Sequence, residues 1–516
     1  MFPSYSLRKT ISFSFIFFLS IVLSLSINKY QYALDGAFVI SGLVEYPSLS
    51  PMNYYYFNSW TFLHQISAFF LKLGFSGDEI SNLLLILSTL CFGMGTFLIT
   101  NSITNNYFFA VLITSSALIL GKNFGDTDYP SLIFSEHSFG MFGFATSTLI
   151  IGLISNNKLF LSSLFTAFLI CIHPVIGVWM MFFYLLSIFL QQKYILVRND
   201  LLYGLILGCF ISAISFYFFF ISKLPINDYD SSLYEIFVKN WDGHRNTESE
   251  IHYAYILKSL ILLIVLVYFK NFFSKKTSPG LDLAIYFFII LIISGLLFYL
   301  SYKLFPFFFP EILIKALPSR FLMIYSFLGW PVIISMTYIF FLKKFLSKKK
   351  LITTFFYILL IFPVIQKEER VINTLKYFYL SEKKEKNVFF EKLKNIDTKN
   401  HILSTTSLNY SILRQSNKPF LFDTNSFDFL PYHPYLIDDI DLIFKEIYEI
   451  DLRVKPKIKN SYVSDNYIKT IFQKKDLNEW KVIFNNHKID YLVVPSDWVI
   501  NLSLVLKNNG ISLYKI

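Results

Sequence analysis

Eleven apolar runs divide residues 1–365, and they constrain the fold more than any other feature of the chain. A helix that crosses a bilayer needs roughly 20 apolar residues, and most of these runs approach or reach that length. Only 16% of the residues are charged, against about 25% in soluble domains. The sequence therefore predicts a polytopic α-helical membrane protein with spans at 11–27, 80–99, 107–121, 138–154, 159–172, 175–190, 201–221, 253–269, 281–301, 320–342 and 351–365.

Two segments need a choice between alternatives. The runs 159–172 and 175–190 are separated only by His173 and Pro174. Together they are too long for one crossing, so they predict a tight hairpin that turns at these two residues. Residues 58–73 carry apolar side chains at helical spacing with polar ones between them, which favours a helix in the membrane interface. An additional span is the alternative, and it would invert the orientation of everything that follows.

The basic residues predict the orientation. If the N-terminus is cytoplasmic, thirteen Lys and Arg fall in the short inner segments and nine in the much longer outer ones. This asymmetry follows the positive-inside rule. Fourteen acids fall in the outer loops, which suggests chemistry or ligand binding on the outer face, with ordinary solvated loops as the alternative. The net charge of +11 thus reflects topology, and nucleic acid is not expected as a partner.

Residues 366–516 differ in character from the membrane region 1–365. Residues 366–400 are charged with a helical pattern, and short apolar runs then alternate with helical stretches. This alternation predicts a small soluble α/β domain, and an odd number of crossings places it on the outer side. The expected strands lie at 402–404, 420–422, 489–494 and 511–514, and the expected helices near 436–450 and 477–486.

Residue types that carry chemistry gather in the predicted outer loops. Asp35 follows the first span, and its neighbours Leu34 and Ala37 would partly exclude water, which raises a carboxyl pKa toward the range of a general base. Arg320 enters a span from the outer side, where a guanidinium can bind phosphate or merely anchor the helix at the interface. The other candidates are Asp126 and Asp128 in a DxD string, Glu136 and His137 before a span, His173 at the hairpin turn, and Asp242, His244 and Arg245 in the fourth outer loop.

The arrangement resembles the GT-C superfamily of glycosyltransferases. The resemblance rests on an acid in a long first outer loop, an interfacial helix after it, a DxD string in the second outer loop, about eleven spans and a C-terminal domain. It implies a multi-pass enzyme of the cytoplasmic (inner) membrane that acts on the extracytoplasmic side. The enzyme would transfer a sugar, with inversion, from a polyprenyl-phosphate carrier to a glycan, lipid or protein acceptor.

The resemblance also implies roles for residues of this chain. Asp35 would be the catalytic carboxylate, and Arg320 would bind the donor phosphate. Asp126 and Asp128 would offer oxygen ligands to a divalent metal, Mg²⁺ or Mn²⁺, although the chemistry does not require one. The remaining predicted residues are Glu136 and His137 at the catalytic centre, and His173, Asp242, His244 and Arg245 in substrate binding.

Three other functions compete with this interpretation. A polysaccharide polymerase or ligase also uses basic side chains on the outer face, but the sizeable domain after the last span counts against it. A lipid or oligosaccharide transporter would carry repeats and ionisable residues near the middle of the bilayer, and the centres of these spans are almost free of charge. A non-catalytic membrane protein is the third alternative.

Overall fold

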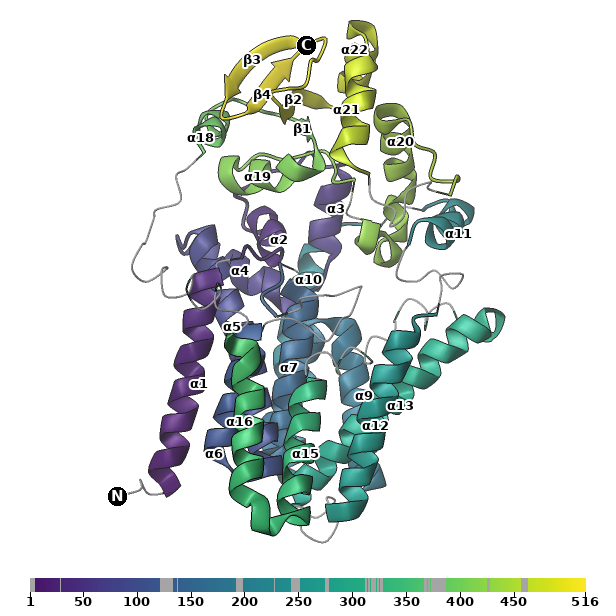
Figure 1. Ribbon diagram of the computed structural model, residues 1–516. Coiled ribbons are helices and arrows are strands. Elements are labelled where there is room, and N and C mark those ends of the chain that lie inside the picture. The colour runs from purple at the N-terminus through teal and green to yellow at the C-terminus, as the bar shows by residue number, and fades with distance from the viewer. Residues whose placement is uncertain are drawn as a thin grey trace.

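The protein is described here from a computed structural model of the whole chain. The structure describes residues 5–27, 29–120, 133–136, 138–191, 198–226, 228–242, 251–273, 278–310, 328–365, 387–424, 427–455 and 463–516, with single residues between 311 and 327 and between 366 and 386. Figure 1 shows a bundle of long helices below and a smaller domain of strands and helices above it.

Each of the eleven apolar runs lies on a helix, in whole or in its described part. Six of these helices are long and apolar enough to cross a membrane, and α6, α8 and α9 are shorter apolar helices. These helices are those of a helical membrane protein; the number of crossings stays a prediction. The bundle consists of α1 (Tyr5–Ile27), α5 (Gly77–Thr104), α6 (Tyr107–Leu120), α7 (Ser138–Ser155), α8 (Leu159–Ile172), α9 (Pro174–Leu190), α10 (Arg198–Ser222), α12 (Tyr253–Phe273), α13 (Pro279–Leu304), α15 (Trp330–Lys344) and α16 (Lys349–Ile365).

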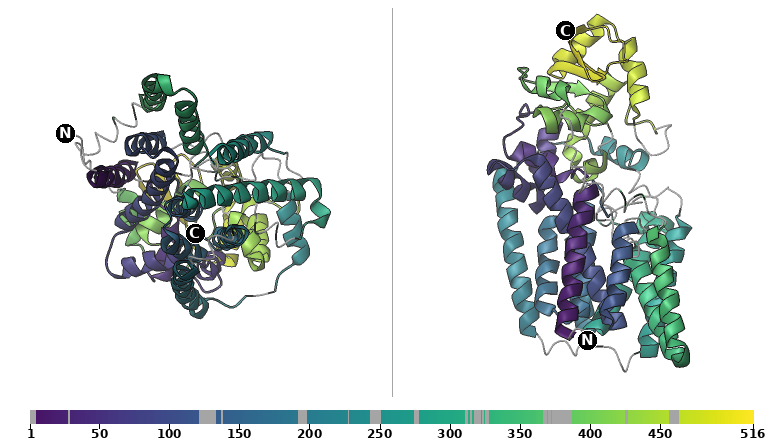
Figure 2. Two further views of the ribbon diagram at one scale, coloured as in Figure 1. Left: turned by 90° about the horizontal axis from the view of Figure 1, so that it is seen from below. Right: turned by 60° about the vertical axis from the view of Figure 1, so that its left-hand side comes forward.

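Contacts at the two ends of α5 identify the two ends of the bundle. At the end that holds the N-terminus, Asn156 after α7 donates to the Leu98 carbonyl of α5 at 3.0 Å. At the other end, the Gln31 amide donates to Ser81 Oγ at 3.1 Å, at the start of α5. The C-terminal domain sits on this second end in both side views (Figures 1 and 2). The Gln31 side chain also donates to the Ser135 carbonyl at 3.0 Å, so the first and second predicted outer loops meet on the domain side of the bundle.

The predicted turn at His173-Pro174 is confirmed. His173 ends α8 and caps α9, whose first residue is Pro174. The two helices pack antiparallel. A hydrogen bond of 2.8 Å between the hydroxyls of Ser162 on α8 and Tyr184 on α9 shows this arrangement. A Cβ atom at Gly177 would lie 2.4 Å from the Ile170 backbone, so glycine allows the two helices to pack closely.

The predicted segment 58–73 contains one helix, α4 (Phe62–Lys72), and its position in the membrane interface stays a prediction. The helices α2 (Ala33–Ile40) and α3 (Pro51–Asn58) precede it. The hydroxyl of Thr61 caps α4 by accepting from the Leu63 amide. The polar residues His64 and Ser67 are buried against the protein, whereas Phe69 is 55% exposed. The buried side of α4 therefore combines these polar residues with the apolar Leu63, Ala68 and Leu71.

The C-terminal domain is built on a four-stranded sheet of order β1-β2-β4-β3. Strands β1 and β2 are parallel, and the other neighbours are antiparallel. The predicted strand 420–422 forms only an isolated bridge from Phe420 to Ile402, and the edge strand β3 was not predicted. The strands are β1 (His401–Ser404), β2 (Ile489–Pro495), β3 (Ser503–Asn508) and β4 (Ile511–Lys515).

Helices surround this sheet, and those at 437–448 and 477–486 match the expected positions. The buried Trp480 of α22 packs edge-on against Phe472 of α21. The remaining charged stretch 366–400 contains one described helix, α18. The helices are α18 (Val388–Lys394), α19 (Thr406–Ser416), α20 (Ile437–Tyr448), α21 (Asp465–Lys474) and α22 (Leu477–Asn486), while α11 (Ser231–Asn240) comes from the fourth outer loop.

Candidate functional site

Asp35 lies in the first turn of α2, close under the C-terminal domain. Its neighbours Leu34 and Ala37 are fully buried, and Asp35 itself is 2% exposed. The amide of Asp35 bonds to the Tyr32 carbonyl at 3.1 Å as the helix begins. A negative charge is favourable at the N-terminus of a helix, but this helix is short, so burial of a carboxylate here requires a further partner.

That partner is Arg414 of α19, which is 379 residues away in the chain. Its Nε donates to Asp35 Oδ1 at 2.9 Å, and its Nη2 donates to Oδ2 at 3.1 Å. The side chains are 17% and 3% exposed. Such a planar, two-bond pair fixes the orientation of the carboxylate as well as its charge. The C-terminal domain thus contacts the candidate base directly.

Aromatic rings enclose the pair. The Arg414 guanidinium carbon lies 3.3 Å from the centre of the Tyr30 ring and 4.9 Å from that of Tyr410. Tyr410 also stacks on Tyr32, with ring centres 5.6 Å apart. The Tyr30 hydroxyl lies 3.4 Å from Asp35 Oδ1. Cation–π contacts strengthen when they are shielded from water, so these rings hold the guanidinium in place.

Glu136 from the second outer loop joins the same group of residues. The Tyr32 hydroxyl donates to Glu136 Oε2 at 2.9 Å, and the Tyr32 amide donates to the Glu136 carbonyl at 3.0 Å. The structure therefore brings two predicted carboxylates, Asp35 and Glu136, to one place. We call this group the first junction; it comprises Tyr30, Tyr32, Asp35, Glu136, Tyr410 and Arg414.

The electrostatics of Asp35 combine two opposing effects. Burial raises the pKa of its carboxyl group, while the charge and hydrogen bonds of Arg414 lower it, and burial is the larger effect. The nearby carboxylate of Glu136 adds a small increase. The net result is a pKa above the ordinary value of Asp, which suits a group that must accept a proton.

Two buried histidines contact the first predicted outer loop, one beside the first junction and one at a separate contact with the C-terminal domain. His64 on α4 packs against Gly36, where a Cβ atom would lie 2.5 Å from the imidazole ring. His433 of the C-terminal domain is hydrogen-bonded to Ser59 Oγ at 3.1 Å and to the Tyr435 hydroxyl at 2.8 Å. Burial lowers the pKa of His64 to about 4 and that of His433 to about 3. Both imidazoles are therefore neutral at pH 7.

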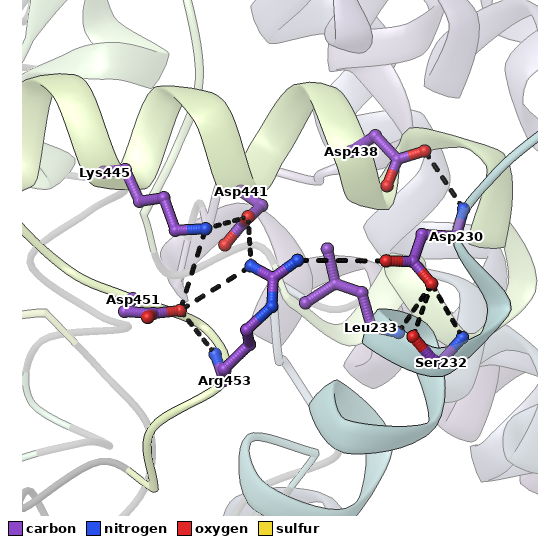
Figure 3. A network of polar contacts seen from close by, with 8 residues as sticks. All are labelled: Asp230, Ser232, Leu233, Asp438, Asp441, Lys445, Asp451 and Arg453. Carbon is purple, nitrogen blue, oxygen red and sulfur yellow. Dashed lines mark hydrogen bonds and ion pairs between the residues drawn. The ribbon is translucent and has the colours of Figure 1, made fainter.

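A second junction joins the C-terminal domain to α11, and Figure 3 shows its ionic part. Arg453 Nη1 lies 2.9 Å from Asp441 Oδ2, and Arg453 Nη2 lies 3.8 Å from Asp230 Oδ2. Asp230 caps α11 and donates its amide to Asp438 at 3.1 Å. Behind this cluster the Trp241 indole donates to the Leu452 carbonyl at 2.8 Å. We define the second junction as Asp230, Trp241, Asp438, Asp441, Leu452 and Arg453.

Of the other predicted residues, the structure describes His173 and Asp242, and both lie on other parts of the molecule. His173 caps α9, where its ring accepts from the Ile176 amide. Asp242 is buried next to Trp241 at the second junction. The predicted residues Asp126, Asp128, His137, His244, Arg245 and Arg320 lie outside the described residues.

The predicted metal site stays a prediction, because Asp126 and Asp128 lie outside the described residues. Within the described part of the chain, no group of three or more His, Cys, Asp or Glu side chains is arranged to hold an ion. Glu136, which could have joined Asp126 and Asp128 as a ligand, is hydrogen-bonded to Tyr32. We therefore derive no chemical step through a metal.

Sequence reasoning missed Arg414, Tyr410 and Tyr30. The spacing of Tyr410 and Arg414 places them one helical turn apart, and this is the only local signal they share. No protein-family model matches the chain, and no curated protein matches it. The geometry of the first junction is therefore the main guide to function.

Proposed function

We propose that the protein is a GT-C-like glycosyltransferase that moves a sugar from a polyprenyl-phosphate carrier to an acceptor on the domain side of the membrane. The observation that carries the proposal is the position of Asp35. Its buried carboxylate is on α2, where the apolar bundle ends and the C-terminal domain begins. A lipid carrier would present its sugar at this level, above the hydrocarbon region.

The chemistry needs a base and a stabiliser for the leaving group. The Asp35 carboxylate would take the proton of an acceptor hydroxyl while the oxygen attacks the anomeric carbon from the face opposite the carrier. The bond from this carbon to the phosphate oxygen breaks, and the lipid phosphate leaves with the electron pair. The configuration is inverted. Cations near the departing phosphate lower the barrier, and Arg320, with Arg245 or a histidine, is the proposed source.

The decisive experiment compares wild-type protein with Asp35→Asn in transfer from a polyprenyl-phosphate sugar. Asn keeps the shape of the side chain but cannot act as a base, so turnover should fall by about 10²–10⁴-fold. Because Asn would leave the Arg414 charge without its counterion, the Asp35→Asn/Arg414→Gln double variant is the matched control. It should unfold less readily than Asp35→Asn and be equally inactive. Near-wild-type turnover in a folded Asp35→Asn protein would remove Asp35 from the mechanism.

The proposal also fixes a topology. The N-terminus would be cytoplasmic and the C-terminal domain extracytoplasmic, in the inner membrane, since the Lys-rich ends of α12, α15 and α16 lie at the N-terminal end of the bundle. A reporter that is active only in the cytoplasm, fused after Ile516, should be silent. A strong signal would contradict the proposed orientation.

A further inference from the structure

We infer that Arg414 is a positioning residue that holds the Asp35 carboxylate ionised and oriented, so that the catalytic centre is shared between the membrane region and the C-terminal domain. The inference rests on the proposed function and deepens it. Its basis is the geometry of the first junction, where both carboxylate oxygens are held by one guanidinium.

The first step concerns the charge of Asp35. A carboxylate that is 2% exposed loses most of its hydration, and the neutral form is then favoured. A neutral carboxyl group cannot take a proton from an acceptor. An adjacent guanidinium restores the ionised form, so a base at this depth depends on its counterion.

The second step concerns orientation. Arg414 binds Asp35 side-on through Nε and Nη2, which places the carboxylate and guanidinium in one plane. The guanidinium is itself fixed, since it lies 3.3 Å from the centre of the Tyr30 ring. Lysine would supply charge but neither the two parallel bonds nor the flat surface. The residue type therefore matters as well as the charge.

Arg414 is the cation that forms the ion pair with Asp35. The titratable and charged groups near Asp35 are Tyr30 and Tyr32 before α2, Tyr46 after it, Tyr56 on α3, the neutral His64 on α4, Asp78 at the start of α5, Glu136 before α7, and Tyr410 with Arg414 on α19. Arg414 is the one cation in this group. The negative charges of Glu136 and Asp78 disfavour a further negative charge nearby, whereas Arg414 favours it.

The test measures the protonation of Asp35 without relying on activity. A hydrophobic carbodiimide reacts with buried carboxyl groups in their protonated form, and mass spectrometry gives the extent of labelling at Asp35 across a pH series. In full-length Arg414→Gln the midpoint of labelling should move upward by about 1–3 pH units, the usual effect of losing an adjacent opposite charge. Arg414→Lys should give a smaller shift, and the control Arg453→Gln at the second junction none.

If Arg414→Gln only released the C-terminal domain from the bundle, the labelling midpoint would move down instead of up. This release would expose Asp35 to water, move the midpoint down toward that of ordinary Asp, and admit a water-soluble carbodiimide. An unchanged or lowered midpoint in Arg414→Gln overturns the inference. In the transfer assay the acid limb of the pH–rate profile should move upward together with the labelling midpoint, and an unmoved limb also overturns it. Absence of transfer by the wild-type protein rejects the proposed function, while the labelling midpoint still decides the relation of Arg414 to Asp35.

Discussion

The two junctions use the same kind of contact in different surroundings: an arginine of the C-terminal domain pairs with an aspartate from a segment between two helices of the bundle. At the first junction the pair is nearly dry, with side chains 17% and 3% exposed and an aromatic ring on the guanidinium. At the second, Arg453 and Asp230 are each 42% exposed and 3.8 Å apart. Water screens the second pair and leaves the first unscreened, so the two should differ in strength, salt dependence and role.

The largest loss of stability should come from removing one partner of the buried Asp35–Arg414 pair and leaving the other in place. Arg414→Ala leaves the Asp35 carboxylate buried without its counterion, which typically costs about 3–5 kcal/mol. Chemical unfolding in detergent, followed by tryptophan fluorescence at pH 8, measures this loss. Asp35→Asn/Arg414→Gln should recover much of it, because no charge is then left alone. Single variants that cost no more than the double variant would show that the pair is not coupled.

The next largest effect should come from acid, which should weaken the buried contact between His433 and Ser59. The pKa of His433 is about 3 in the folded protein, below the ordinary value of about 6.5, so the folded state favours the neutral ring. The stability contribution is complete above pH 6.5 and is lost as pH falls from there toward 3. Between pH 7 and pH 5 the loss from His433 should be about 2 kcal/mol. His433→Gln should flatten this part of the pH–stability curve, and an unchanged slope would contradict the assignment.

At the second junction the buried hydrogen bond should matter more than the ions. Trp241→Phe keeps an aromatic side chain but removes the donor to the Leu452 carbonyl, a loss of about 1 kcal/mol, and the smaller ring adds the cost of the space it leaves. This loss should be the same at low and high salt, since no charge is removed. Thermal unfolding at two salt concentrations measures it. A marked salt dependence would mean that the tryptophan acts through the ionic cluster.

The smallest effect should come from the exposed arginine. Arg453→Gln removes ion pairs to Asp441 and Asp230, but with the side chain 42% exposed the loss should stay within roughly 0.5 kcal/mol. It should vanish at about 1 M salt, where the screening length is about 3 Å. A loss as large as that of Arg414→Ala would remove the distinction between the two junctions.

The parts of the fold that were predicted are those with a strong local pattern. Apolar runs gave the helices of the bundle, and His173-Pro174 gave the hairpin because proline starts a new helix. Strand β3 was missed since most of its side chains are exposed and Lys507 and Asn508 end it. Helix α4 was predicted from the spacing of its apolar residues, but the burial of His64 and Ser67 was not, because the pattern shows that two faces differ but not which one meets the protein.

The candidate site divides in the same way. Asp35 was found because an acid between apolar neighbours is conspicuous in a sequence. Arg414 was missed because its significance depends on a partner 379 residues away, and nothing near Arg414 distinguishes it from any other arginine on a helix. Contacts between distant segments leave no local pattern in a sequence. The contact of Arg414 with Asp35, which compensates the buried charge, is of this kind.

That long separation has a consequence for biosynthesis. Ribosomes add roughly 5–20 residues per second, so about 20–75 s pass between the synthesis of Asp35 and that of Arg414, which is 379 residues later. Throughout this time the nascent first loop waits at the membrane with an uncompensated acid, while the remaining helices are inserted. Chains truncated before α19 should keep this loop open to proteases, and quality control could use that openness to recognise unfinished molecules.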